Sequence, residues 1–112
     1  MRNLVLENTL CEAIKKHLVI RLKYDKDLLW RIFEPQAVYK STVDHINVTG
    51  IQTEDKNKPF RPPKREPRNF ELSKISAVEI TDTEFNFDPT FDPADKRFAH
   101  GIICVLKSIK IS

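Results

Sequence analysis

The sequence predicts a mainly β protein with short helices, in which antiparallel strands form a small, partly open barrel preceded by one N-terminal helix. Two observations predict this fold. Apolar and polar residues alternate in several short runs, as they do in strands with one buried face. No helical segment separates these runs, although a parallel sheet would need such crossovers. The 112 residues suffice for a single domain with one core, here residues 1–112.

The leading helix is expected over residues 9–17. Thr9 and Glu12 have the spacing of a capping box, in which each side chain satisfies a free backbone N–H at the start of a helix. An apolar stripe follows at helical spacing. His17 comes at the end of this stripe beside two lysines, and we interpret it as a helix-end residue that suits the helix dipole.

Barrel strands are expected within residues 18–82. The first, 18–24, alternates cleanly, and a short turn leads to a second strand over 28–34, which is expected to stop at Pro35 because proline cannot donate to a ladder. A third strand is expected over 45–51. It contains Gly50, and a glycine inside a strand usually marks a bulge, a bend or a close backbone approach.

Residues 54–67 form a basic, proline-rich segment with four of the seven prolines, which predicts an extended loop. From residue 54 to residue 68 the chain carries six cations against three acids. From residue 79 to residue 95 it carries six acids and no cation. This two-sided charge can steer an anion or a partner, although each run alone is also typical of a solvated surface.

Residues 68–75 are the most informative segment. As a strand, they would place four residues on the inward face: Arg68, Phe70, Leu72 and Lys74. Arg31 would share an inward face in the same way. Because burying an unpaired charge is unfavourable, these cations should pair with acids, reach the rim of the barrel, or bind an anion.

The tail, residues 83–112, contains two Phe-Asp-Pro repeats. Asp92 followed by Pro93 predicts the start of a short helix, Gly101 predicts its end, and residues 102–111 predict a final strand. Cys11 and Cys104 are interpreted as buried thiols in a reducing compartment, and a disulfide between them is not expected.

No metal site and no cofactor are expected, because the three histidines and two cysteines lack metal-ligand spacing. No apolar run is long enough to cross a membrane, and Glu7 interrupts the apolar start before it could form a signal peptide. We therefore expect no membrane partner and a cytoplasmic location.

Several ordered segments resemble the WYL domain, a module of bacterial transcriptional and defence regulators with an Sm-like or SH3-like barrel. The resemblance runs from Leu10 to about Ile103 and is carried by these segments: Ala13-Ile14, Ile20-Arg21-Leu22-Lys23-Tyr24, Arg31-Ile32-Phe33-Glu34-Pro35, Arg68-x-Phe70-x-Leu72-x-Lys74-Ile75, Phe85 through Asp92, and Phe98 to Ile102. The chain departs from the family where the Trp-Tyr-Leu tripeptide would fall, on Ile46-Asn47-Val48. Ser73 and Lys74 also replace the family's aspartate and second arginine.

The resemblance implies a stand-alone, non-enzymatic regulatory module that binds a nucleotide or single-stranded nucleic acid. The expected ligand-binding residues are Tyr24, Arg31, Arg68 and Lys74, with Arg61, Lys64 and Arg65 as anion contacts from the loop. An alternative remains open, in which Arg31 and Arg68 pair with Glu34, Glu71 or the acidic run. A second alternative is a protein-interaction or oligomerisation subunit with no ligand of its own. No motif of an enzyme is found, so catalysis is not expected.

Overall fold

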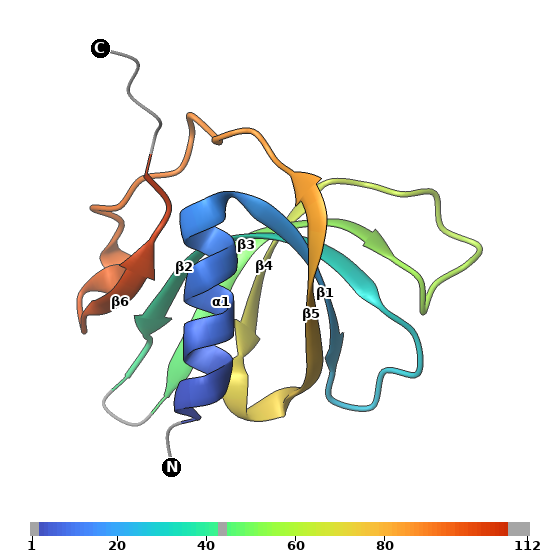
Figure 1. The fold of residues 1–112 in the computed structure, drawn as a ribbon, viewed down its shortest axis with the longest axis horizontal. Helices are drawn as coiled ribbons and strands as arrows, with labels where there is room; N and C mark the ends of the chain where they lie inside the picture. The colour runs from blue at the N-terminus through green and yellow to red at the C-terminus, as the bar shows by residue number, and fades with distance from the viewer. Residues whose placement is uncertain (1–2, 43–44, 108–112) are drawn as a thin grey trace.

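In the computed structural model, which describes residues 3–42 and 45–107, one helix lies across a strongly curved antiparallel sheet (Figure 1). The elements are α1 (Leu4–Lys16), β1 (Leu18–Tyr24), β2 (Arg31–Lys40), β3 (Ile46–Asp55), β4 (Glu66–Glu71), the 3-10 helix η1 (Leu72–Lys74), β5 (Ile75–Glu84), the 3-10 helix η2 (Lys96–Phe98) and β6 (Ile102–Val105). The strands pair in the order β4-β3-β2-β1-β5, and β6 pairs with β2. Among the described residues the two end strands, β4 and β5, do not pair with each other, so the barrel is not closed. The predicted mainly β, partly open barrel with a leading helix is confirmed.

Helix α1 begins earlier than predicted. The Asn3 side chain caps it by accepting a hydrogen bond from the backbone N–H of Leu6 at 3.0 Å. Thr9 lies inside the helix, where its hydroxyl donates to the carbonyl of Val5 at 3.0 Å. The capping box predicted at Thr9 is therefore wrong, because a better cap precedes it by six residues. The helix-end role of His17 is confirmed, since this residue adopts the left-handed conformation at the C-cap.

The hydrophobic core lies between α1 and the concave side of the sheet. The helix buries Leu10, Ala13 and Ile14 against inward side chains of the strands. The largest fully buried apolar side chains are Phe33, Leu10, Ile14, Ile20, Leu22, Val38, Val48 and Pro35. Each large apolar side chain buried in this way contributes about 1.5–3 kcal/mol, so this core is the main stabilising feature of the domain.

Strand β2 does not stop at Pro35 but continues to Lys40, so the predicted end of the second strand is wrong. The first part of β2, up to Phe33, pairs with β1, and the part from Ala37 onward pairs with β6. Pro35 lies between these two ladders, where β2 has no partner on that side. Pro35 therefore removes no hydrogen bond from the ladders with β1 and β6, and Gln36 is accommodated in an irregularity of the register with β3.

Strand β3 is longer than predicted and extends to Asp55, which shortens the following loop to residues 56–65. Gly50 lies opposite Pro35 on β2 and opposite Arg68 on β4. A Cβ atom at Gly50 would lie 2.2 Å from the carbonyl oxygen of Glu34 and 2.7 Å from the ring of Phe33. Of the three alternatives predicted for this glycine, a bulge, a bend or a close backbone approach, the structure shows the close approach.

Residues 68–75 do not form one strand, which corrects the prediction for this segment. Strand β4 ends at Glu71, and η1 turns the chain from β4, at one edge of the sheet, to β5, at the other. The carbonyl of Lys74 accepts a hydrogen bond from the N–H of Asp25 at 2.7 Å, which anchors this turn. Arg68 and Phe70 therefore keep the shared inward face, whereas Lys74 leaves it.

The tail contains a shorter helical turn than predicted. Asp95, not Asp92, caps η2 by accepting from the N–H of Arg97, while Asp92 accepts from the N–H of Ala94 in the preceding turn. Gly101 ends this turn with a φ of 120°. Strand β6 covers only the first four residues of the predicted final strand, and residues 108–111 of that prediction lie outside the described part of the chain.

A disulfide joins Cys11 in the middle of α1 to Cys104 in β6, with a Cα–Cα distance of 5.8 Å. The interpretation of these residues as free thiols is wrong, because α1 and β6 lie side by side in the fold (Figure 1) and bring two cysteines 93 residues apart into bonding distance. Among the described residues, no helix is long and apolar enough to cross a membrane.

Candidate anion-binding site

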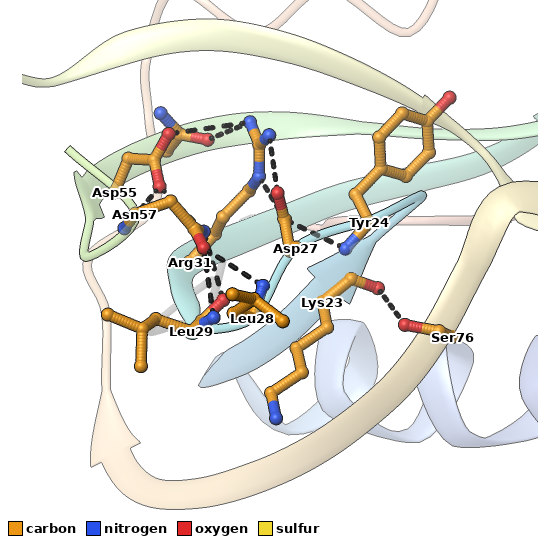
Figure 2. Close-up of polar contacts among 10 residues, drawn as sticks. Lys23, Tyr24, Asp27, Leu28, Leu29, Arg31, Asp55, Asn57 and Ser76 are labelled. Carbon is orange, nitrogen blue, oxygen red and sulfur yellow. Dashed lines mark hydrogen bonds and ion pairs between the residues drawn. The ribbon is translucent and has the colours of Figure 1, made fainter.

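Arg31, the first residue of β2, lies at the end of the barrel and faces inward like Phe33. Its guanidinium donates to both carboxylate oxygens of Asp27, at 2.6 and 3.2 Å, and to Oε1 of Gln52 at 3.3 Å (Figure 2). Asp55 Oδ2 lies 3.8 Å from Nη1 on the other side. The side chain of Arg31 is only 18% exposed, and its positive charge is neutralised by two acids.

These acids differ from the ones expected. Asp27 comes from the β1–β2 turn and Asp55 from the end of β3, whereas Glu34, Glu71 and the acidic run do not contact Arg31. Hydrogen bonding to Asp27 outweighs burial and raises the pKa of Arg31. Burial raises the pKa of Asp27, but the hydrogen bonds from Arg31 and the Tyr24 N–H, with nearby positive charge, lower it overall. Arg31 is therefore a paired, structural cation.

We expect Asp27→Asn to lower the free energy of unfolding by about 1–3 kcal/mol at neutral pH, because it removes one charge of a largely buried pair. Since folding lowers the pKa of Asp27, its ionic contribution is present above the carboxyl's unfolded pKa of about 3.9 and is lost as pH falls through the lower, folded pKa. Urea unfolding from pH 7 to pH 3 should show the two proteins converging. The control is Asp25→Asn, an exposed acid in the same turn; an equal effect of both variants would contradict the prediction.

Tyr24 lies beside Arg31 at the end of β1. Its ring packs against Phe70 with centroids 4.8 Å apart, and its hydroxyl accepts a hydrogen bond from the N–H of Glu71 at 3.2 Å. Tyr24 and Arg31 line an open depression of about 660 Å³ over the β1–β2 turn. Tyr24 therefore has a structural role, because its side chain joins β1 to β4. Only part of this side chain faces the depression.

Asn57 ties the β1–β2 turn to the start of the β3–β4 loop. Its side-chain oxygen accepts from the N–H groups of Leu28 and Leu29, at 3.2 and 2.9 Å, and its amide donates to the carbonyl of Leu29 at 2.9 Å (Figure 2). The Asn57 N–H and amide also donate to Asp55 Oδ1. The two loops at this end of the barrel are thus held together.

A second cavity, of about 200 Å³, lies where the β3–β4 loop meets the sheet. Its lining residues are Gln52, Asp55, Lys58, Arg61, Pro62, Lys64, Glu66 and Arg68. Arg68 reaches it from the inward face of β4, and its Nη2 lies 3.5 Å from Glu66 Oε1. Its Nε atom is buried and has no hydrogen-bond partner among the described residues. Four cations and two acids line this cavity, so its lining is positive overall.

Three of the four cations of this cavity were predicted from the sequence as ligand contacts, namely Arg61, Lys64 and Arg68. Lys58 was missed, although it belongs to the same basic segment. Gln52 and Asp55 were also missed, because only the pairing of β3 with β2 and β4 places them against Arg31 and beside Arg68. Gln52 and Asp55 therefore line the cavity and also contact Arg31.

Like Tyr24 and Arg31, two further predicted residues lie outside this cavity. Arg65 forms a two-pronged ion pair with Glu34, at 2.9 and 3.0 Å, and this contact raises the pKa of Arg65. Lys74 lies in η1, where its side chain is 57% exposed and its nearest acid is Glu71 at 3.8 Å. The structure does not bring Arg65 or Lys74 to the cavity around Arg68.

The acidic run supplies turns and a helix cap. Asp88 Oδ1 accepts from both the N–H and the hydroxyl of Thr90, and these bonds lower the pKa of Asp88. Asp92 and Asp95 each accept from the N–H two residues later. In the described part of the chain, no group of three or more acidic, histidine or cysteine side chains is arranged to hold a metal ion.

Comparisons with known proteins assign no family to the chain. No protein-family model, no curated protein and no solved structure matches it significantly. Membership of the WYL family therefore stays a prediction, and the functional argument rests on the geometry of the cavity around Arg68.

Proposed function

We propose that this chain is a non-enzymatic binding module that holds a phosphate-bearing ligand, a nucleotide or single-stranded nucleic acid, in the cavity around Arg68. The observation that carries the proposal is the buried Nε of Arg68, which finds no acceptor within the described part of the chain and belongs to a cavity lined by three further cations. Leaving a buried donor atom without a hydrogen bond is costly. A phosphate oxygen supplies the missing acceptor, and its charge balances the cations of the cavity that Asp55 and Glu66 do not neutralise.

The size of the cavity limits how much of a ligand it encloses. Pockets that enclose a drug-sized ligand usually measure about 300–1,000 Å³, whereas this cavity has about 200 Å³. It suits a phosphate group with its nearest neighbours, and the rest of the ligand would extend over the loop. Phe60, between Lys58 and Arg61 in sequence, is 99% exposed there, and exposed aromatic rings near cations suit base stacking.

The proposed role is that of a WYL-type regulatory module, as the resemblance implies. Because two of the family's name-giving aromatic residues are replaced at Ile46-Asn47-Val48, base stacking in this chain would depend on other rings.

The cytoplasmic location also stays a prediction. The Cys11–Cys104 disulfide weighs against it, because disulfides persist mainly in oxidising compartments. Alkylating free thiols in intact cells, followed by mass spectrometry, would test the location.

The proposal is tested with Arg68→Gln. We expect this variant to weaken binding of nucleotides and labelled oligonucleotides about tenfold to a hundredfold, because a hydrogen bond to a charged group contributes about 1.5–3 kcal/mol. Binding should also depend less steeply on salt, because one phosphate contact is lost. Calorimetry and fluorescence anisotropy at two salt concentrations measure both effects.

The matched control is Lys96→Gln, which removes the same charge from an exposed residue of η2 that does not line the cavity. It should bind like the parent protein. If the parent protein binds no phosphate compound even at low salt, or if both variants bind equally well, the proposal is wrong.

A second candidate function is protein interaction or self-association. Leu28 and Leu29, in the β1–β2 turn, are 84% and 51% exposed, and the fully exposed Phe60 belongs to the adjoining loop. Exposed apolar side chains on neighbouring loops can mark a contact surface. Sedimentation equilibrium of the parent protein and of a Leu28→Ser, Phe60→Ser variant would reveal an oligomer that depends on these side chains.

A further inference from the structure

We infer that the cavity around Arg68 prefers a phosphate ester with a hydroxyl group close to the phosphate, as in a sugar phosphate, and that Asp55 binds this hydroxyl. The inference rests on the proposed function, because it concerns the same cavity. It adds a second recognition element of opposite chemistry, which the basic residues alone would not predict.

Asp55 is held in place at the end of β3. Its Oδ1 atom accepts two hydrogen bonds from Asn57, from the backbone N–H at 2.9 Å and from the side-chain amide at 3.0 Å. The side chain is only 8% exposed. Its orientation is therefore set by the fold, and Oδ2 is directed away from Asn57.

Oδ2 of Asp55 is buried without a hydrogen bond. Arg31 Nη1, at 3.8 Å, is close enough to balance the charge but too far to donate a hydrogen bond. Among the described residues, two buried side-chain polar atoms lack a hydrogen-bond partner, Asp55 Oδ2 and Arg68 Nε. Both side chains line the same cavity.

The two unpartnered atoms have complementary needs. Arg68 Nε needs an acceptor and Asp55 Oδ2 needs a donor, and each buried atom left unpaired destabilises the protein. A phosphate group without a neighbouring donor satisfies Arg68 only and brings negative charge toward Asp55 and Glu66. A phosphate ester with a hydroxyl on an adjacent carbon carries both the acceptor that Arg68 Nε lacks and the donor that Asp55 Oδ2 lacks. The pairing of an orphan donor with an orphan acceptor therefore favours a hydroxyl-bearing ester.

Both atoms have almost no accessible surface, so a ligand reaches them only if covering side chains move. Arg61, Pro62 and Lys64, which line the cavity, come from the β3–β4 loop. Asn57 anchors the start of this loop to the β1–β2 turn. We therefore expect the later part of the loop to move outward when the ester enters, while residues up to Asn57 stay in place.

The experiment compares two esters that differ only in hydroxyl groups, glycerol 3-phosphate and propyl phosphate. Calorimetry or NMR titration of the parent protein should show about tenfold to a hundredfold tighter binding of glycerol 3-phosphate, which corresponds to one hydrogen bond to a charged group. Asp55→Asn replaces the charged acceptor Oδ2 with an amide N–H donor, so the ligand hydroxyl loses the acceptor to which it would donate. This variant should lose the preference and still bind propyl phosphate.

Asp82→Asn is the matched control, because it makes the same change at an exposed acid of β5 that does not line the cavity. It should retain the preference for glycerol 3-phosphate, and a thermal melt of each variant confirms folding. Equal binding of the two esters by the parent protein overturns the inference but leaves the proposed function intact. A folded Asp55→Asn protein that keeps the preference overturns the assignment to Asp55. If neither ester nor any nucleotide binds, the proposed function itself is wrong.

Discussion

Reduction of the Cys11–Cys104 disulfide is expected to lower the free energy of unfolding by about 4–5 kcal/mol, the largest effect that we predict for this protein. The two cysteines are 93 residues apart, so the bond closes most of the chain into one loop. A cross-link across about 100 residues removes enough freedom from the unfolded chain to stabilise the fold by about 4.7 kcal/mol. For a domain of this size the melting temperature should fall by roughly 20 °C or more.

The loss should begin at β6. This strand is only four residues long, and it is held by its ladder with β2 and by the disulfide to α1. After reduction, hydrogen exchange should increase first in Ile102–Val105 and in the part of β2 that pairs with it. Calorimetry with and without reductant measures the global effect, and exchange mass spectrometry measures the local one.

The control is the double variant Cys11→Ser, Cys104→Ser, which should resemble the reduced parent protein and show no response to reductant. Equal melting temperatures for the oxidised and reduced parent protein would contradict the prediction. So would free thiols in the natively purified chain.

Gly50→Ala is expected to destabilise the domain by about 3 kcal/mol or more, the second-largest effect. The added Cβ would lie 2.2 Å from the carbonyl oxygen of Glu34 and 2.7 Å from the Phe33 ring. The first atom belongs to the backbone of β2 and the second to a fully buried side chain, so neither moves without disturbing the sheet. Overpacking of a dense core typically costs about 1–3 kcal/mol, and backbone clashes cost more.

Gly101→Ala separates this steric effect from the general effect of losing a glycine. Gly101 has a φ of 120° and no atom within 4 Å of the position of a Cβ, so only backbone strain of about 1–3 kcal/mol is expected there. Urea unfolding of both variants measures the difference. If Gly50→Ala were no more destabilising than Gly101→Ala, the prediction that close packing requires a glycine at position 50 would be wrong.

Local patterns predicted the elements better than their ends. The alternation in residues 18–24 predicted β1 because one face of this strand is buried in the core. Pro35 was predicted to end β2 because a proline is unfavourable inside a sheet. Its position between two ladders depends on where β1 and β6 end, and no local pattern carries that information.

The candidate site was predictable in part. Arg31 and Arg68 lie two residues before Phe33 and Phe70, so the alternation of a strand predicts that they share the inward face. Lys74 has the same spacing in the sequence, but it does not lie on that face, because a 3-10 turn interrupts the strand at Leu72. Tertiary packing thus decided which inward cations are brought together.

The antiparallel barrel, its leading helix and the two inward arginines were predictable from the order of residues, because they depend on the side-chain periods of strands and helices. The pairing of charges depends on how the elements pack. Arg31 is neutralised by Asp27 and Asp55, whereas Arg68 pairs with Glu66 and its Nε atom has no hydrogen-bond partner among the described residues. Ion pairs and the disulfide join residues from different elements, and their geometry depends on strand register and packing that the order of residues does not show.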